Sequence, residues 1–382
     1  MRRIESKLSF GLPYIYSLYI LNYFIVSATD LSFIPAVNYF GRIINIFVFG
    51  CLIITFLVIE KTIKNWIVSI SVLFLAILSM YFTGEKDILI FFLFFFCSFN
   101  LNFNKFLKID FITRLICFSV ILLLFYLGVT SDVILFRDGV PRHSLGLYHP
   151  NTLGMFVFSI VIDYIALNWK KFRLKNFLVI FIALYFIYKF PNSLTAIYAI
   201  LISIVFLFFS KFFDKKMIRN ILNFTPVFLS VFSVYLAMMG NNLKTLIPQY
   251  DSLFSGRLWY FSYLYSNYKF TVFGNKILEL DAGYARSRMF NVRYLDNSYL
   301  SLAIRYGFIL FIIFIILLLI LGIYFTKTNN LNLLFIIIIF SIYSFTENIL
   351  FRPEFVIICM MGSFYAYKSN LIRENERVIS NE

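Results

Sequence analysis

The sequence predicts an all-α polytopic membrane protein with about 12 transmembrane helices and one large extracytoplasmic loop. Hydrophobic residues make up 61% of the 382 residues and charged residues only 14%, whereas a soluble domain is about half apolar and about a quarter charged. Phenylalanine occurs 51 times, often in runs such as 91–99. A soluble protein would have to bury nearly all of these side chains, so lipid is the expected solvent.

The apolar stretches divide the chain into candidate spans. A helix crosses the bilayer core with about 20 apolar residues, in a range of roughly 17 to 25. The stretches follow one another without a linker that would mark a second domain, so a single integral membrane domain over 1–382 is predicted. The candidate spans are 9–27, 42–59, 66–83, 88–103, 111–130, 150–168, 176–190, 193–210, 221–240, 298–325, 331–347 and 354–368.

The basic residues predict the orientation of the spans. A net charge of +15 would suit nucleic acid, but the lysines and arginines cluster just beyond apolar stretches, in every second linker. Such linkers face the cytoplasm, which with an even number of spans places both termini there and leaves no nucleic-acid partner. The four cysteines lie inside apolar stretches as packing residues, so no disulfide framework, metal or cofactor is expected.

Two linkers on the outer side stand apart, a loop over 131–151 and a loop over 241–296. The second is far longer than a helix connection requires. It retains Trp259, several tyrosines and apolar pieces, so it is expected to fold back on the membrane surface, with a short amphipathic helix over 256–268. Both loops are candidates for the chemistry of the protein.

The 131–151 loop holds both histidines of the chain. His149 stands where the next helix begins, and helix starts attract anions. The alternative is a solvated loop whose arginines meet lipid headgroups, and Arg137 and Asp138 fit that alternative best. The polar residues that the loop gathers are Arg137, Asp138, Arg142, His143, His149 and Asn151.

The 241–296 loop carries a second set of arginines and leads into a long apolar helix. Asp296 immediately precedes that helix, where its alternative role is an N-cap. Arg305 lies about two turns inside the same helix, where an unpaired charge would cost roughly 2.5–3.5 kcal/mol at the bilayer centre, so it should face a polar cavity or an anion. The candidates here are Arg257, Arg286, Arg288, Arg293, Asp296, Asn297 and Arg305.

Other acidic residues support a metal or a transport role only weakly. Glu279 and Asp281 resemble an acidic metal-binding pair, but a solvated role is favoured for so short a pattern. Asp163, Glu347 and Glu354 would suit a proton path, although pairing with arginines is the favoured interpretation. Several arginines in an outer pocket instead suit a diphosphate, because guanidinium groups pair bidentately with phosphate oxygens and stay charged.

Three fragments carry a resemblance to a known family. RHSLGLYHPNTLG, SGRLWY and DNSYLSLAIRYG occur in this order in a many-helix chain with one large late outer loop. In this the chain resembles the O-antigen polymerase (Wzy-type) and O-antigen ligase superfamily of bacterial envelope glycosyltransferases. The resemblance implies an O-antigen ligase/polymerase-like (GT-C-type) architecture in the bacterial cytoplasmic membrane.

The resemblance also implies roles for individual residues. Arg142 and Arg257 would hold a lipid-linked diphosphate, and the residue before Asn297 would be the base. The related ligases commonly have histidine there, in a pattern like HNxYL, whereas this chain has Asp296. His149 and Glu347 are therefore kept as substitute bases. His143, His149, Asn151 and Asn297 would shape the pocket, with Arg286, Arg288, Arg293 and Arg305 as secondary contacts.

The activity implied is that of a metal-independent polymerase. It would transfer a growing glycan from undecaprenyl diphosphate to the next lipid-linked repeat unit of a capsule, exopolysaccharide or O-antigen on the outer face of the membrane. Besides this substrate and membrane lipids, a chain-length regulator and a flippase are the implied partners. Two other functions remain open: a ligase that moves finished glycan to another acceptor, and a flippase or exporter of lipid-linked glycan.

Overall fold

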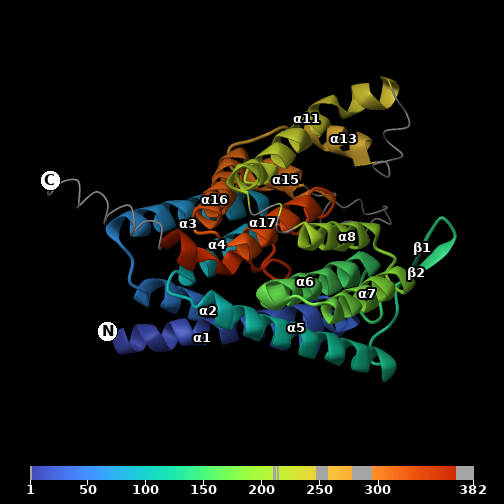
Figure 1. The fold of residues 1–382 in the computed structure, drawn as a ribbon, viewed down its shortest axis with the longest axis horizontal. Coiled ribbons are helices and arrows are strands. Elements are labelled where there is room, and N and C mark those ends of the chain that lie inside the picture. Colours follow the sequence, from blue (N-terminus) through green and yellow to red (C-terminus); the bar gives the residue numbers. More distant parts are fainter. Residues whose placement is uncertain (1, 210–211, 213–214, 247–256, 278–294, 367–382) are drawn as a thin grey trace. The chain divides into compact units, whose positions relative to one another are not determined.

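The described residues of the computed structural model form helices and one small two-stranded hairpin (Figure 1). The structure describes residues 2–209, 212, 215–246, 257–277 and 295–366. Its α-helices are α1 Arg2–Asn22, α2 Pro35–Val58, α3 Ile63–Thr83, α4 Asp87–Cys97, α5 Phe103–Tyr126, α6 Pro150–Asn168, α7 Leu174–Lys189, α8 Leu194–Phe208, α10 Lys216–Leu222, α11 Thr225–Leu246, α13 Arg257–Tyr268, α15 Ser298–Leu300, α16 Phe308–Lys327 and α17 Leu331–Tyr343.

Long apolar helices confirm the prediction of an all-α membrane protein. Among the described residues, six helices are long and apolar enough to cross a membrane, and they include α2, α3, α5 and α16. Others are shorter: α4 has 11 residues and α17 has 13, which at 1.5 Å per residue gives about 16 and 20 Å. The count of twelve spans and the cytoplasmic position of the termini stay predictions.

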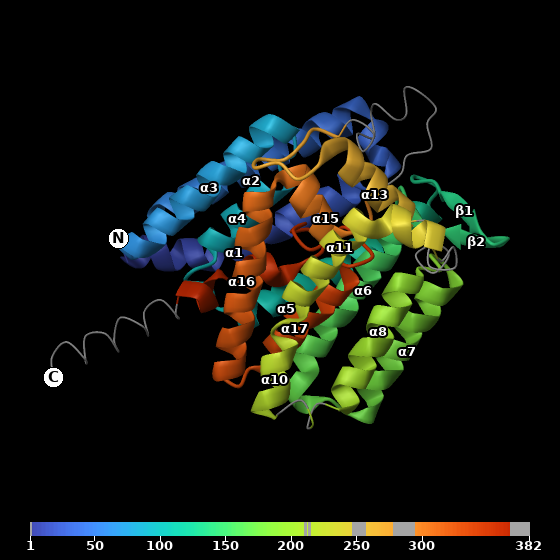
Figure 2. The ribbon, with the colours of Figure 1, turned by 90° about the horizontal axis from the view of Figure 1, so that it is seen from above.

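The chain folds as two compact units, each built from separate stretches. Unit 1 comprises Met1–Thr62, Leu93–Phe208 and Pro353–Glu382. Within it, α6, α7 and α8 lie side by side (Figure 2), and α1 packs against α2 and α5. The close approach of α6 to α8 depends on small side chains, because a Cβ at Gly154 would collide with Ser193.

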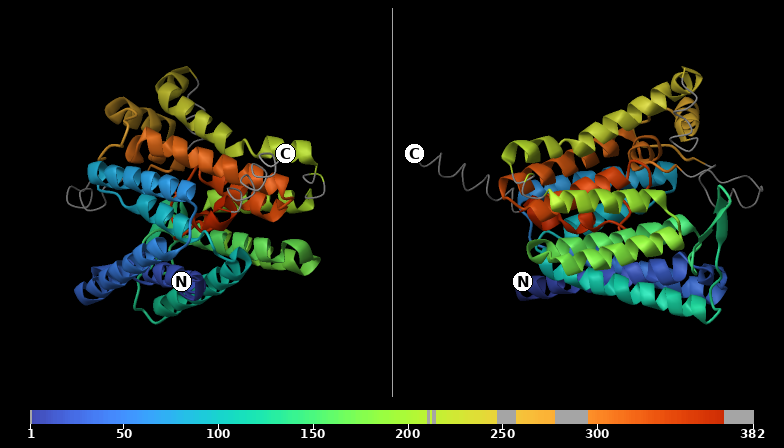
Figure 3. Two further views of the ribbon diagram at one scale, coloured as in Figure 1. Left: turned by 90° about the vertical axis from the view of Figure 1, so that its left-hand side faces the viewer. Right: turned by 45° about the vertical axis from the view of Figure 1, so that its right-hand side comes forward.

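A hairpin in unit 1 replaces the irregular loop expected over 131–151. Strand β1, Ile134–Arg137, pairs antiparallel with β2, Val140–His143, and the hairpin stands beyond the ends of the green helices (Figure 3). Asp138 and Gly139 join the strands with φ values of 52° and 79°. Two positive φ values define the type I′ turn that Asp-Gly favours, so the signal for this hairpin was present in the sequence.

The last span predicted, 354–368, is wrong as a continuous helix. Turns occupy 353–355, a 3₁₀-helix runs over Ile357–Met360, and an α-helical turn begins only at 362. Three carbonyl oxygens that a helix would have satisfied internally accept side-chain donors of unit 1 instead. They are those of Pro353, Glu354 and Phe355, bonded by Tyr16, Arg114 and Ser159 at 2.6, 2.8 and 2.9 Å.

Unit 2 comprises Ile63–Phe92 and Phe209–Arg352, and in it α11 packs along α16 and α17. The helix predicted over 298–325 is wrong in one respect, because it is broken at Gly307, which has a φ of 105°. A π-helix, Ser301–Tyr306, precedes the break, and α16 follows it. The short helix expected over 256–268 is confirmed as α13.

Neighbouring segments of unit 2 satisfy the backbone groups that the break exposes. The amide and side chain of Asn275 donate to the carbonyls of Arg305 and Ile304 at 3.1 and 2.9 Å. Ser79 donates to the carbonyl of Tyr306 at 2.7 Å, and the amide of Phe308 donates to Thr271 at 2.9 Å. Such compensation is what a break in an apolar segment requires, since lipid offers no partner.

Candidate functional site

The 131–151 segment of unit 1 brings most of its predicted polar residues into one neighbourhood. The amide of Tyr148 donates to the carbonyl of Ala28 at 2.9 Å, and Leu147 forms a bridge with Thr29. The amide of His143 donates to the carbonyl of Phe190 at 2.8 Å. These bonds fasten the segment between Ala28 and Thr29, which follow the π-helix Tyr23–Ser27, and the turn that joins α7 to α8. Its side chains are therefore held in defined places.

Arg142 is the most buried charged residue of this segment, with 5% of its surface exposed. Its Nε donates to the carbonyl of Pro191 at 2.9 Å, and its Nη2 donates to Oδ1 of Asn151 at the start of α6. The two acceptors are a backbone carbonyl oxygen and a side-chain amide oxygen. The two bonds use two of its five N–H groups and fix its plane.

His149 caps α6. Its Nδ1 accepts the backbone N–H of Asn151 at 3.0 Å, and Pro150 follows at the first helical position. Burial, together with the positive charges of Arg142 and Arg137, lowers the pKa of His149 to about 4. The ring is therefore neutral at pH 7, its lone pair lies on the capping Nδ1, and its Nε2 carries the proton. His149 is placed as a hydrogen-bond donor.

The helix start is accordingly less open to an anion than its sequence suggests. Pro150 has no N–H, and the first N–H of α6 is already bonded to the His149 ring. The amides of Thr152 and Leu153 donate to the carbonyl of His149. The start of α6 therefore offers an anion few backbone donors.

His143 forms a close pair with Asp132. Its Nδ1 lies 2.6 Å from Oδ2 of Asp132, and the two side chains are 30% and 16% exposed. The other carboxylate oxygen, Oδ1, accepts the amides of Ser144 and Leu145 at 2.8 and 3.0 Å. His143 was predicted as a substrate contact, and Asp132 was not among the predicted site residues.

In unit 2, Asn297, not Asp296, caps the helix that follows. The Oδ1 of Asn297 accepts the amide of Leu300 at 2.9 Å, and its Nδ2 donates to Ser233 and to the carbonyl of Phe345. The alternative role of Asp296 as an N-cap is therefore wrong. Asp296 itself is half-buried, and its role as base stays a prediction.

Arg305 forms an ion pair with Glu85 in unit 2. This confirms that its charge meets an anion, but the anion is a carboxylate of the chain itself. Glu347 is buried at the last turn, where its carbonyl accepts the Ser298 hydroxyl at 2.8 Å. The side chain of Arg257 and all of Glu279, Asp281, Arg286, Arg288 and Arg293 lie outside the described residues.

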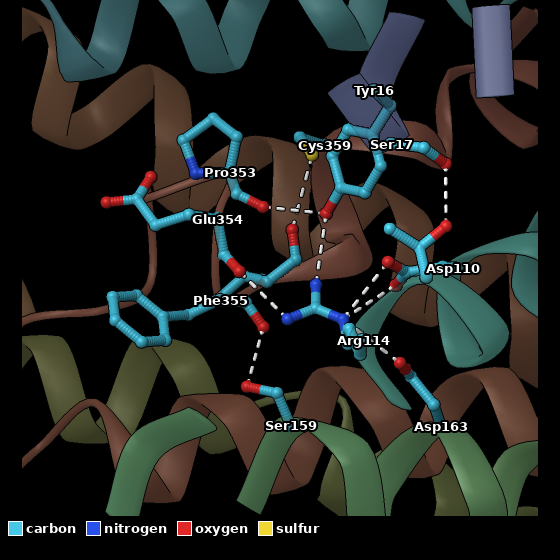
Figure 4. A network of polar contacts seen from close by, with 12 residues as sticks. Tyr16, Ser17, Asp110, Arg114, Ser159, Asp163, Pro353, Glu354, Phe355 and Cys359 are labelled. Carbon is cyan, nitrogen blue, oxygen red and sulfur yellow. Dashed lines mark hydrogen bonds and ion pairs between the residues drawn. The ribbon is translucent and has the colours of Figure 1, made fainter. Parts of the chain in front are cut away.

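A buried ionic network in unit 1 escaped the sequence analysis (Figure 4). Arg114, near the middle of α5, pairs through Nε with Asp110 at 3.0 Å and with Asp163 of α6 at 3.2 Å. Its Nη2 also donates to the Tyr16 hydroxyl at 3.2 Å. Asp163 thus pairs with an arginine, which was the interpretation favoured over a proton path. Asp110 and Arg114 are four residues apart inside an apolar stretch, and this spacing is the sequence signal that could have predicted their ion pair.

This network anchors the irregular segment that follows Pro353. Arg114 and Tyr16 donate to two of its carbonyls, Ser159 donates to a third, and Tyr19 donates to the carboxylate of Glu354 at 3.2 Å. The charged side chains of Asp110, Arg114 and Asp163 are at most 1% exposed. The network is therefore sealed from solvent and holds the fold.

The residues predicted to act together fall in both units. Unit 1 gathers Arg142, His143, His149 and Asn151, and unit 2 holds Asp296, Asn297 and Arg305. The predicted meeting of Arg142 with Arg257 and Asp296 stays a prediction. No family model, no curated protein and no solved structure matches the chain.

Proposed function

We propose that the protein is a glycan polymerase of the membrane, which transfers a growing chain from a polyprenyl diphosphate to the next lipid-linked repeat unit. The observation that carries the proposal is the placement of Arg142, buried and bonded to two neutral oxygens beside the neutral donor His149. A fixed, charged guanidinium with a second donor beside it suits the diphosphate of such a substrate.

The chemistry of the leaving group explains why an arginine is needed. When the bond between sugar and diphosphate breaks, negative charge grows on the departing oxygen. Donors that are already oriented stabilise this charge without having to reorganise. Arg142 is held by Pro191 and Asn151, so it meets that condition, and the Nε2–H of His149 would add a second, neutral bond.

The fold adds indirect support. The lipid tail of the donor needs a membrane protein, which the apolar helices provide. The segment that carries Arg142 lies in the connection between α5 and α6, two helices long and apolar enough to span a membrane. A diphosphate bound there would lie at the end of a candidate span, where a lipid headgroup is found.

Replacing Arg142 tests the proposal. Purified protein in lipid vesicles is given the lipid-linked repeat unit alone, and product length is followed on gels. Wild-type protein should extend chains without an added energy source. Arg142→Ala should lower the rate by about 100- to 1,000-fold, as removal of one donor to a developing anion does. Arg142→Lys should recover only part of the rate, because it keeps the charge but loses the planar fork.

Arg137→Ala is the matched control, because this arginine lies in the same hairpin but is more exposed. Its activity should stay near that of wild type, and thermal unfolding should show that all three variants are folded. Normal chain growth in folded Arg142→Ala would overturn the site. Single transfer of finished glycan to another acceptor would indicate a ligase, and movement of lipid-linked glycan without growth would indicate an exporter; both contradict the proposed function.

A further inference from the structure

We infer that His143, oriented by Asp132, is the base that takes the proton of the acceptor hydroxyl, in place of Asp296. The inference rests on the proposed function. The geometry that carries it is the contact of 2.6 Å between His143 Nδ1 and Asp132 Oδ2, at the end of β2 next to Arg142. A carboxylate that orients an imidazole from Nδ1 leaves the other ring nitrogen to react.

Asp132 is built as an orienting group. Its Oδ1 accepts the amides of Ser144 and Leu145, where the chain turns through a φ of 47° at Leu145. The Ser144 hydroxyl accepts the amide of Val133 at 2.8 Å, which ties the two ends of the hairpin together. Both oxygens of the carboxylate are thus held, and the imidazole that it contacts is held with them.

The ionisation of Asp132 decides the tautomer of His143. Burial alone would raise the pKa of Asp132, but the hydrogen bonds from His143, Leu145 and Ser144 outweigh that effect and hold its pKa below the ordinary value. An ionised carboxylate only accepts hydrogen bonds, so Nδ1 of His143 carries the proton. The lone pair of the neutral ring then lies on Nε2.

The ring that carries this lone pair is partly exposed. The side chain of His143 is 30% exposed, and within the described part of the chain its Nε2 makes no hydrogen bond. The carboxylate of Asp132 also stabilises the imidazolium that forms when Nε2 takes a proton. His143 therefore has the three properties of a general base: an oriented ring, a free lone pair on one side and a counter-charge on the other.

His149 has the opposite arrangement. Its lone pair is on Nδ1, where it accepts the amide of Asn151, and its proton is on Nε2. Its low pKa, about 4, comes from burial and from neighbouring arginines. The two histidines of the chain are thus fitted for different tasks, with His149 donating to the leaving diphosphate and His143 accepting from the incoming hydroxyl.

The reaction balances with these two groups. The acceptor hydroxyl oxygen forms a bond to the anomeric carbon of the donor glycan, and its proton passes to Nε2 of His143. The bond between that carbon and the diphosphate oxygen breaks, and its electron pair leaves with the polyprenyl diphosphate beside Arg142. His143 then releases the proton to water. Arg142 and His143 are consecutive residues at the end of β2.

The test compares His143→Ala, Asp132→Asn and Asp296→Asn in the vesicle assay between pH 5 and 9. His143→Ala should lower kcat by about 100- to 10,000-fold with little change in KM for the donor. Added imidazole should restore part of the rate, increasingly as more of it is unprotonated. Asp132→Asn should lower kcat, because the ring loses the carboxylate that holds the proton on Nδ1. A purely structural role of the pair does not predict the rescue by imidazole.

Three outcomes separate a failure of the base assignment from a failure of the proposed function. If wild-type protein extends chains but His143→Ala does so at an undiminished rate, the base assignment is overturned and the polymerase stands. If Asp296→Asn loses chain growth and His143→Ala keeps it, the base is Asp296. If wild-type protein extends no chains, the proposed function fails before either variant is tested.

Discussion

Arg114→Met should leave little folded protein. The substitution removes the one cation of the buried network and strands two carboxylates, Asp110 and Asp163, together with the carbonyl of Glu354. Removing one partner of a buried ion pair costs about 3–5 kcal/mol, a large part of the about 5–15 kcal/mol that stabilises a typical protein. The measurements are the yield of monodisperse protein in detergent and its thermal unfolding midpoint.

Asp163→Asn is the matched control for this prediction. One guanidinium faces two carboxylates, so the neutral isostere removes an excess negative charge and leaves the pair of Arg114 with Asp110 intact. Its unfolding midpoint should stay close to that of wild type. Tyr16→Phe should cost about 1–3 kcal/mol, because it leaves the Pro353 carbonyl without its 2.6 Å bond. Wild-type stability of Arg114→Met would show that the network does not hold the irregular segment.

Gly274→Ala should strongly destabilise unit 2. A Cβ there would collide with the backbone carbonyl of Arg305, and φ is +97°. The same carbonyl accepts the amide of Asn275, so displacing it also opens the bonds that compensate the helix break at Gly307. The positive φ and the collision together should cost about 2–5 kcal/mol. Thermal unfolding and protease sensitivity of the purified protein measure this loss.

Gly84→Ala separates the collision from the backbone strain. Gly84 belongs to the same unit and has a φ of +78°, but a Cβ there would meet no atom within 4 Å. Its cost should therefore be limited to the strain of a left-handed residue, about 1–2 kcal/mol. Equal losses in the two variants would mean that the contact between Gly274 and Arg305 contributes nothing.

Hydropathy located most helices because apolar side chains and an internally bonded backbone are both required by lipid. The stretches 42–59 and 150–168, for example, correspond to α2 and α6. Hydropathy failed to predict the helix break at Gly307 and the irregular segment 353–361, because the composition there is just as apolar. A window of apolar residues does not reveal that Ser79, Asn275, Arg114 and Tyr16 donate to carbonyls far away in the chain.

The candidate site, too, could be predicted from the sequence only in part. Clustering of histidine and arginine pointed to 131–151, and the structure places Arg142 with Asn151 and His149 there. The partnership of His143 with Asp132, eleven residues earlier, depends on the pairing of β1 with β2, which brings the two ends of the hairpin together. Residue types alone therefore indicated the segment but not the role of each histidine.

The sequence by itself determined the solvent of this protein and the places of most of its helices, because lipid accepts apolar side chains and excludes unpaired backbone groups. Only the tertiary structure decided where the helices break, because a break is stable only where distant donors reach the exposed carbonyls. It also decided which nitrogen of each histidine holds the proton. That depends on the partner of Nδ1, which is a carboxylate for His143 and a backbone amide for His149.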